Sequence, residues 1–107
     1  MRCAEVYRNG NLAGTLIETD QGRFEFTYDN NYYNDSSMPA ISLTLPKSQQ
    51  TYTSEYLFPF FYNMLSEGTN RLVQSKHLRI DEQDFFGLLL ATAKYDTTGA
   101  ITIKQID

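Results

Sequence analysis

The chain of 107 residues has few of the side chains on which disulfide-rich and metal-binding domains depend. It contains one cysteine, one histidine and no tryptophan. Cys3 has no second cysteine with which to form an internal disulfide, and we expect its thiol to be buried in the first strand of a protein from a reducing compartment. Because His77 is the only histidine, the chain cannot assemble a zinc site or a cysteine–histidine pair supported by a second histidine. We therefore expect neither a metal nor another cofactor.

Basic charge and long apolar runs are also scarce. Nine lysine and arginine residues against thirteen acidic residues give a net charge of −4, which argues against direct binding to nucleic acid. The N-terminus has no apolar stretch of signal-peptide length, and the longest apolar run, FFGLLLATA at 85–93, is far too short to span a membrane. We expect a cytoplasmic protein without membrane contact.

The remaining composition is that of a folded domain. Hydrophobic residues make up 41% and aromatic residues 14% of the chain, which is too apolar for a disordered protein. Most chains of this length form one domain, so we expect a single domain over residues 1–107 with one hydrophobic core.

The first half of the sequence predicts strands. CAEVY and LAGTLI flank Asn9-Gly10, the pair favoured in a type I′ turn, which predicts a hairpin. GRFEFTY alternates apolar and polar residues and is typical of a half-buried antiparallel strand. Residues 29–39 are rich in asparagine, aspartate and serine and predict a surface loop. AISLTL at 40–45 then predicts a fourth strand that ends before Pro46.

The second half predicts helices and one closing strand. An apolar stripe with helical spacing favours a helix over about 55–65, started by Ser54, with Pro59 in or near its first turn and Gly68 at its end; its members are Leu57, Phe58, Phe60, Phe61, Met64 and Leu65. A shorter helix is expected at 70–77. A third is expected at 82–93, capped by Asp81, with Asp84 in its first turn and its apolar face formed by residues from Phe85 to Leu89. The final strand is AITIKQI. The predicted fold is α+β: an antiparallel meander plus a C-terminal strand packed against about three helices.

No motif in the chain predicts catalysis. GNLAG at 10–14 joins two predicted strands, so no helix N-terminus follows it to bind a phosphate. DFFG at 84–87 resembles a kinase magnesium-binding motif with one residue too many, but no catalytic-loop motif precedes it. No pair of carboxylates stands in a setting that would raise a pKa. We expect a non-catalytic interaction domain.

Several segments together resemble a known family. Asn9-Gly10, Gly14, FEFTY, ISLTLP, PFFYNMLSEG, DFFGLL and DTTGA occur in the order found in the N-terminal domain of HipA-type kinases from bacterial toxin–antitoxin systems. The resemblance covers nearly the whole chain, with Ser66 and Lys94 in place of a proline and a glycine of the usual pattern. In HipA this domain precedes a Ser/Thr kinase region and packs against it.

The resemblance implies one of two roles. A free-standing domain is similar to HipS of the three-gene HipBST systems, which binds and neutralises a separately encoded HipT kinase; a HipB-like helix-turn-helix protein completes such complexes and carries the DNA binding. The alternative is the structural N-terminal domain of a fused HipA-like kinase, with no independent activity. In both cases catalysis belongs to the kinase.

The turn after the first predicted helix is the candidate partner-binding surface. A loop between two helices can present its side chains rigidly to another protein, and a small basic cluster, which otherwise would be an ordinary solvated face, follows it. The predicted binding residues are Ser66, Glu67, Thr69, Asn70, Arg71, Lys76 and Arg79. The turn could equally be a simple connection. If the interface lies elsewhere, the loop with Tyr32 and Tyr33 is the alternative.

Overall fold

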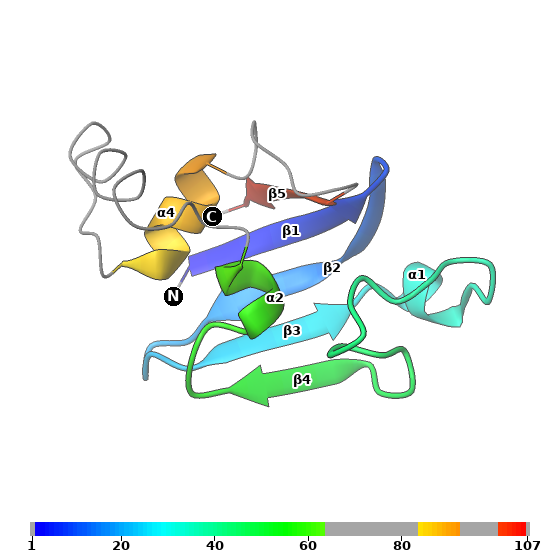
Figure 1. Ribbon diagram of the computed structural model, residues 1–107, viewed down its shortest axis with the longest axis horizontal. Coiled ribbons are helices and arrows are strands. Elements are labelled where there is room, and N and C mark those ends of the chain that lie inside the picture. The colour runs from blue at the N-terminus through cyan, green and yellow to red at the C-terminus, as the bar shows by residue number, and fades with distance from the viewer. Residues whose placement is uncertain (1, 64–83, 93–100, 107) are drawn as a thin grey trace.

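A five-stranded antiparallel sheet forms the frame of the molecule (Figure 1). The structure is a computed structural model that describes residues 2–63, 84–92 and 101–106. The strands lie in the order β4-β3-β2-β1-β5, so the last strand of the chain pairs with the first. Their bounds are β1 Arg2–Arg8, β2 Asn11–Glu18, β3 Phe24–Tyr28, β4 Thr51–Ser54 and β5 Ile101–Gln105.

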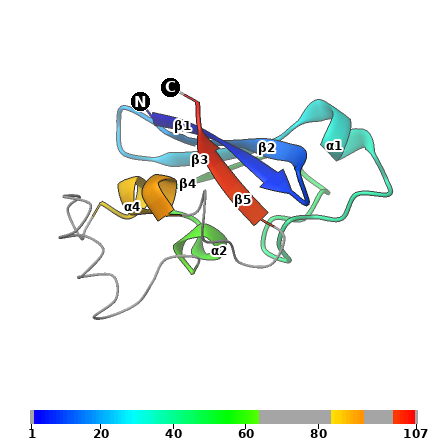
Figure 2. The ribbon, with the colours of Figure 1, turned by 90° about the horizontal axis from the view of Figure 1, so that it is seen from above.

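Two of the three described helices lie on the same face of the sheet, which we call the helical face (Figure 2). The described helices are α1 Asn30–Asn34, α2 Pro59–Tyr62 and α4 Phe85–Thr92. The ring of Phe26 packs 5.8 Å from Phe61 of α2, and Phe24 stacks 5.9 Å from Phe86 of α4. The predicted α+β fold, with its helices on the Phe24 and Phe26 face, is confirmed. No helix within the described ranges is long and apolar enough to cross a membrane.

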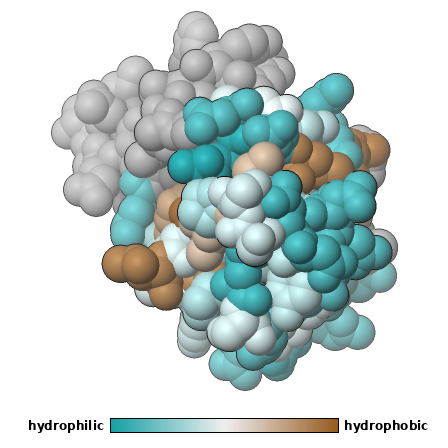
Figure 3. Space-filling view, turned by 90° about the vertical axis from the view of Figure 1, so that its right-hand side faces the viewer, coloured by the Kyte–Doolittle hydropathy of each residue, from teal (hydrophilic) through white to brown (hydrophobic). Residues whose placement is uncertain are grey.

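The core lies between the sheet and these helices. Inward-facing residues of the strands alternate with outward-facing ones, as the period of an antiparallel strand requires. The residues that are at most 1% exposed are Ala4, Val6, Ala13, Leu16, Phe26, Tyr28, Phe61, Phe86, Leu88, Leu89 and Ile103. The same alternation places Cys3 on the outward face, where it is only partly buried, so the expectation of a buried thiol is wrong. The end of the molecule that carries α1 has a mainly hydrophilic surface (Figure 3).

The first hairpin forms as predicted, with one irregularity. Asn9 and Gly10 have φ values of 50° and 80°, as a type I′ turn requires, and Arg8 pairs with Asn11. The register shifts between Val6 and Tyr7, and the extra residue on β2 is Ala13. Next to it, Gly14 lies so close to β3 that a Cβ atom would meet the Thr27 carbonyl oxygen at 2.4 Å. The close packing of β2 on β3 therefore depends on glycine at this position.

The predicted fourth strand at 40–45 is wrong, because those residues form turns and β4 lies at Thr51–Ser54. Ser42 bonds locally: its hydroxyl accepts from the Thr44 N–H and its carbonyl accepts from the Leu45 N–H. Such side-chain bonds compete with a sheet ladder. The position beside β3 is taken by β4, whose register pairs Phe24 with Ser54.

The helix boundaries differ from the prediction in three places. The loop after β3 contains α1, whose N-cap is Asp29. The first long predicted helix does not start at Ser54, which ends β4; Phe58 is the N-cap of α2 and Pro59 its first residue, since a residue before proline disfavours the helical conformation. In α4, Asp84 lies before the helix rather than in its first turn. The helix predicted at 70–77, the cap at Asp81 and the stop at Gly68 lie outside the described residues.

Candidate functional site

The predicted partner-binding residues lie in a part of the chain that the structure does not describe. The described residues end at Asn63, after α2, and resume at Asp84, before α4. The prediction of an interface therefore remains a prediction; its residues are Ser66, Glu67, Thr69, Asn70, Arg71, Lys76 and Arg79. What the structure does show is the two elements that flank this segment in the sequence, α2 and α4.

Helix α2 is held against the sheet by aromatic packing. Phe61 is 0% exposed and contacts three other rings, those of Phe26, Phe58 and Phe60, with centroids 5.2 to 6.3 Å away. Pro59 supplies a first helical residue whose missing N–H needs no partner. Because Phe61 is fully buried, the four-residue helix is fixed by the core rather than by its own hydrogen bonds.

Helix α4 is held by a charged network at its N-terminus. Asp84 Oδ1 accepts a hydrogen bond of 3.1 Å from the Gly87 N–H, the geometry of an N-cap. The Arg2 guanidinium donates two bonds to Asp84, of 2.8 and 3.0 Å, and two to Glu18, of 2.8 and 2.9 Å. It also lies 5.2 Å from the centre of the Phe86 ring. One arginine thus joins β1, β2 and α4.

The network sets the charge state of Asp84. Hydrogen bonds from Arg2 are the largest cause that lowers the pKa of Asp84 below its ordinary value; partial burial acts the other way, and the Gly87 N–H adds to the lowering. Asp84 is therefore an anion paired with a cation. Such a carboxyl is unsuited to act as a general acid at neutral pH.

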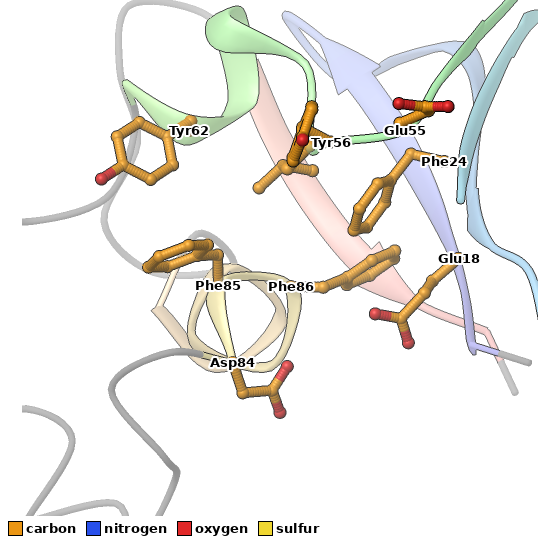
Figure 4. Close-up of a pocket in the computed structure, with 9 residues that line it drawn as sticks. Glu18, Phe24, Glu55, Tyr56, Tyr62, Asp84, Phe85 and Phe86 are labelled. Carbon is orange, nitrogen blue, oxygen red and sulfur yellow. The ribbon is translucent and has the colours of Figure 1, made fainter. Parts of the chain in front are cut away.

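A pocket of about 390 Å³ lies between α2, α4 and the sheet (Figure 4). Tyr62 and Phe85 form one aromatic wall, with centroids 5.1 Å apart, and Phe24 stacked on Phe86 forms another. Of the carboxylates at its rim, Glu18 and Asp84 converge on Arg2, and Glu55 lies apart from them in Figure 4. The lining residues are Glu18, Phe24, Glu55, Tyr56, Leu57, Tyr62, Asp84, Phe85 and Phe86. These groups offer apolar contact and include no nucleophile paired with a base.

A second pocket, of about 330 Å³, lies beside α1 and is more polar. It includes Tyr32, which is only 3% exposed and stacks on Tyr28 with the two rings 4° from parallel. Tyr32 is therefore a core residue with little exposed surface, and the alternative interface at the loop with Tyr32 and Tyr33 remains a prediction. Tyr33 is half-buried. Among the residues that the structure describes, no group of three histidine, cysteine, aspartate or glutamate side chains could hold a metal ion.

Sequence reasoning missed two features of the described surface. The Arg2–Glu18–Asp84 network joins residues up to 82 positions apart, and no local pattern indicates it. Leu43 was expected in a strand but is 99% exposed. The prolines at both ends of its segment, Pro39 and Pro46, are the one available signal that the segment is not a regular strand.

Residues 4–104 match the HipA N-terminal domain family. This chain belongs to that family. The match spans nearly all of the five-stranded sheet and its helices, so the whole described fold is the family domain.

Two curated relatives that match this chain differ greatly in length. An uncharacterized protein of Haemophilus influenzae is 33% identical over 105 residues, which are 98% of this chain and 93% of that protein. Y4mE of Sinorhizobium fredii, a protein named as a candidate kinase, is 27% identical over 107 residues, 100% of this chain but 25% of its own length. Among solved structures, the N-terminal domain of HipA toxin has a TM-score of 0.75 at 29% identity, with 100% of this chain and 94% of that chain covered.

Proposed function

We propose that this chain is a HipS-like regulatory protein that binds a HipA- or HipT-like Ser/Thr kinase in trans and restrains its activity. The supporting observation is the match of residues 4–104 to the HipA N-terminal domain together with a relative, that of Haemophilus influenzae, of nearly this chain's length. If a domain packs against the kinase in a fused protein, the same surface of a separately encoded domain can bind a separate kinase. The proposed binding surface remains the predicted turn and basic cluster, from Ser66 to Arg79.

In this proposal the chain supplies binding and the partner supplies chemistry. The sequence has neither a nucleotide-binding loop nor an aspartate in a kinase catalytic context. Its charge of −4 gives no diffuse basic surface for nucleic acid, so DNA binding belongs to a HipB-like helix-turn-helix protein in the same complex. The complex is proposed to be cytoplasmic and to need no cofactor from this chain.

The second candidate function is that of the structural N-terminal domain of a fused HipA-like kinase. The observation that favours it is Y4mE, in which the matched region is 25% of a protein named as a candidate kinase. The reading frame beyond Asp107 in the source genome separates the two candidates. A stop codon there supports the separate regulator, and a continuous frame into a kinase region supports the fused domain.

The biochemical test is a titration of the purified chain into the HipA-like kinase encoded in the same genome. We expect binding by calorimetry and a fall in kinase autophosphorylation that is complete near stoichiometric amounts. The chain alone, incubated with ATP, should transfer no phosphate; an acidic protein of similar size is the control for nonspecific effects. Full kinase activity in the presence of excess chain, with no heat of binding, would rule out the proposal.

A further inference from the structure

The most exposed large apolar side chain of the described surface is Leu43, at 99%. It lies at the centre of the segment PAISLTLP, residues 39–46, which contains no charged residue in a chain of 22 charged ones, the nine basic and thirteen acidic together. Single exposed leucines are common on protein surfaces. This one differs because its loop is fastened on both sides.

Hydrogen bonds from three tyrosines, two of them in the core, hold the 39–46 loop. The Tyr28 hydroxyl accepts from the Ile41 N–H at 3.1 Å and donates to the Leu45 carbonyl. At the two ends of the loop, the hydroxyls of Tyr32 and Tyr52 donate to the carbonyls of the two prolines. These contacts order the residues on both sides of Leu43, and so its exposure is not the result of a loose loop.

Burial on either side of Leu43 adds a second constraint. Ile41 and Leu45 are 8% and 2% exposed, so their side chains belong to the core while the side chain between them points to solvent. A preordered loop loses little conformational entropy when a partner binds it. An exposed apolar side chain on a preordered loop is suited to act as an anchor residue in a protein–protein interface.

Position and charge indicate the partner. Ile41 and Leu45 pack with the core cluster that includes Phe61, so the loop sits on the helical face beside α2 (Figure 2). In the sequence, the segment that carries the predicted kinase-binding turn follows that helix. The loop carries no charged side chain. Its Ser42 and Thr44 hydroxyls bond to each other, and the adjacent Lys47 donates to the carbonyls of Asp35 and Met38. These polar groups are engaged within the chain, which disfavours phosphates and anionic membranes as the partner. An apolar socket on a folded protein fits this loop.

We infer that residues 39–46 form a docking loop whose anchor, Leu43, inserts into an apolar socket of the HipA-like kinase. This inference rests on the proposed function and extends it to a contact outside the predicted turn. The loop acts by contact alone and takes no part in phosphate transfer.

The test compares Leu43→Ser with Leu43→Met and Ile106→Ser in binding to the immobilised kinase from the same genome. Leu43→Ser removes the apolar anchor, and we expect its Kd to rise about 10- to 100-fold, the equivalent of the transfer free energy of one buried leucine. Leu43→Met keeps apolar volume and should bind within about threefold of the natural chain. Ile106, 49% exposed, follows β5 and bonds to Cys3 at the opposite end of the sheet, so its substitution should leave Kd unchanged.

Each outcome decides the inference. Binding of the natural chain with an unchanged Kd for Leu43→Ser overturns the docking loop but leaves the proposed function standing, whereas no binding by the natural chain overturns both. Light scattering of the chain alone tests a second copy as the occupant: a dimer that Leu43→Ser dissociates, with kinase binding unaffected, also overturns the inference. Thermal unfolding of all variants checks the fold, which an exposed substitution should preserve.

Discussion

At the residue scale, the Tyr28 hydroxyl connects the sheet to the loop that follows it. Tyr28 is 1% exposed, and its ring packs in edge-to-face geometry 4.9 Å from Phe26 and stacks on Tyr32. Its hydroxyl satisfies one donor and one acceptor of a buried backbone, at Ile41 and Leu45. Without these bonds the backbone polar groups at Ile41 and Leu45 would be buried unpaired, so one oxygen atom allows these two residues to enter the core from an irregular segment.

Replacing Tyr28 with phenylalanine tests this connection. The variant keeps the ring but leaves the Ile41 N–H and the Leu45 carbonyl without their partner, and we expect the free energy of unfolding to fall by about 1–3 kcal/mol. Urea denaturation measures the change. Tyr56→Phe is the matched control, because Tyr56 is 78% exposed and the loss of its hydroxyl should change stability by no more than about 0.5 kcal/mol. Equal stability of the two variants would contradict the assigned role.

Ionisation of the same hydroxyl predicts an alkaline limit. Burial raises the pKa of Tyr28 from 10.0 to about 12, and the Ile41 N–H opposes the shift. The folded pKa lies above the unfolded one, so the stabilisation is complete below about pH 10 and is lost as the pH rises towards 12. In an absorbance titration of the eight tyrosines, we expect a late-ionising component that is missing in Tyr28→Phe; identical titration curves would contradict it.

At the scale of elements, α4 depends on contacts made at its first turn. The helix has eight residues and includes Gly87, which lowers helix propensity. Asp84 supplies the cap, and Arg2, the first residue of β1, ties that cap to Glu18, the last residue of β2. A Cβ atom on Gly87 would lie 2.3 Å from Asp84 Oδ2, so glycine leaves room for the carboxylate to turn back over the helix. The charged network therefore sets where α4 begins.

Two substitutions of Asp84 separate its cap from its charge. Asp84→Ala removes both, and we expect a loss of about 1–2 kcal/mol in unfolding free energy; Asp84→Asn keeps a capping oxygen and should lose less. Because the folded pKa of Asp84 is lowered, its contribution is present above the ordinary carboxyl value of 3.8 and is lost as pH falls through the folded pKa. The difference in unfolding free energy between the natural chain and Asp84→Ala should therefore become smaller at acidic pH.

Denaturant titrations at neutral and acidic pH measure that difference. Glu55→Gln serves as the control, since Glu55 is 69% exposed and its contact with Arg23 is 3.6 Å long, which is a surface pair of little energetic weight. A difference between the natural chain and Asp84→Ala that stays constant through acidification would show that the charge of Asp84 does not stabilise α4.

At the scale of the whole molecule, the sheet is covered asymmetrically. Helices α2 and α4 and the 39–46 loop pack on the helical face, and no described helix lies against the opposite face (Figure 2). The described apolar pocket and Leu43 are therefore associated with the side on which α2 lies. A partner that binds this side would contact aromatic and aliphatic side chains. Because the chain has a net charge of −4, long-range attraction of an acidic partner surface would depend on local basic groups.

Charge reversal of Arg71 and Arg79 tests the predicted basic surface. In Arg71→Glu/Arg79→Glu we expect weaker binding to the kinase, mainly through slower association at low salt, because local charge steers encounter. Stability should change by no more than about 0.5 kcal/mol per surface substitution. The control is Arg23→Glu/Lys104→Glu, which changes the net charge by the same amount. Arg23 directly precedes β3 and Lys104 lies in β5. Association rates from surface plasmon resonance over a range of salt concentrations decide: equal rates for the two double variants would move the interface away from the basic cluster.

Local rules were sufficient wherever neighbours along the chain decide the conformation. Asn9 and Gly10 favour positive φ by themselves, and they form the predicted turn. The alternation of Phe24, Phe26 and Tyr28 places all three on the core side. Pro59 restricts its own φ and the residue before it, so it stands in the first turn of α2, although the expected start at Ser54 was wrong. Family membership followed from the same order of short motifs.

Tertiary structure alone decided what depends on distant partners. Two stretches, 40–45 and 51–54, could each pair with β3, and the second does. The backbone polar groups of the first are paired instead by the Tyr28 hydroxyl and by local bonds of Ser42, which hold it as a turn. A regular hairpin through Asn9-Gly10 would set Arg2 opposite Ile17, but the bulge at Ala13 shifts the register and sets Arg2 opposite Glu18. Arg2 can then bind Glu18 and Asp84 together. Which pairing forms depends on the free energy of the whole fold, and a local sequence pattern carries no information about contacts with distant residues.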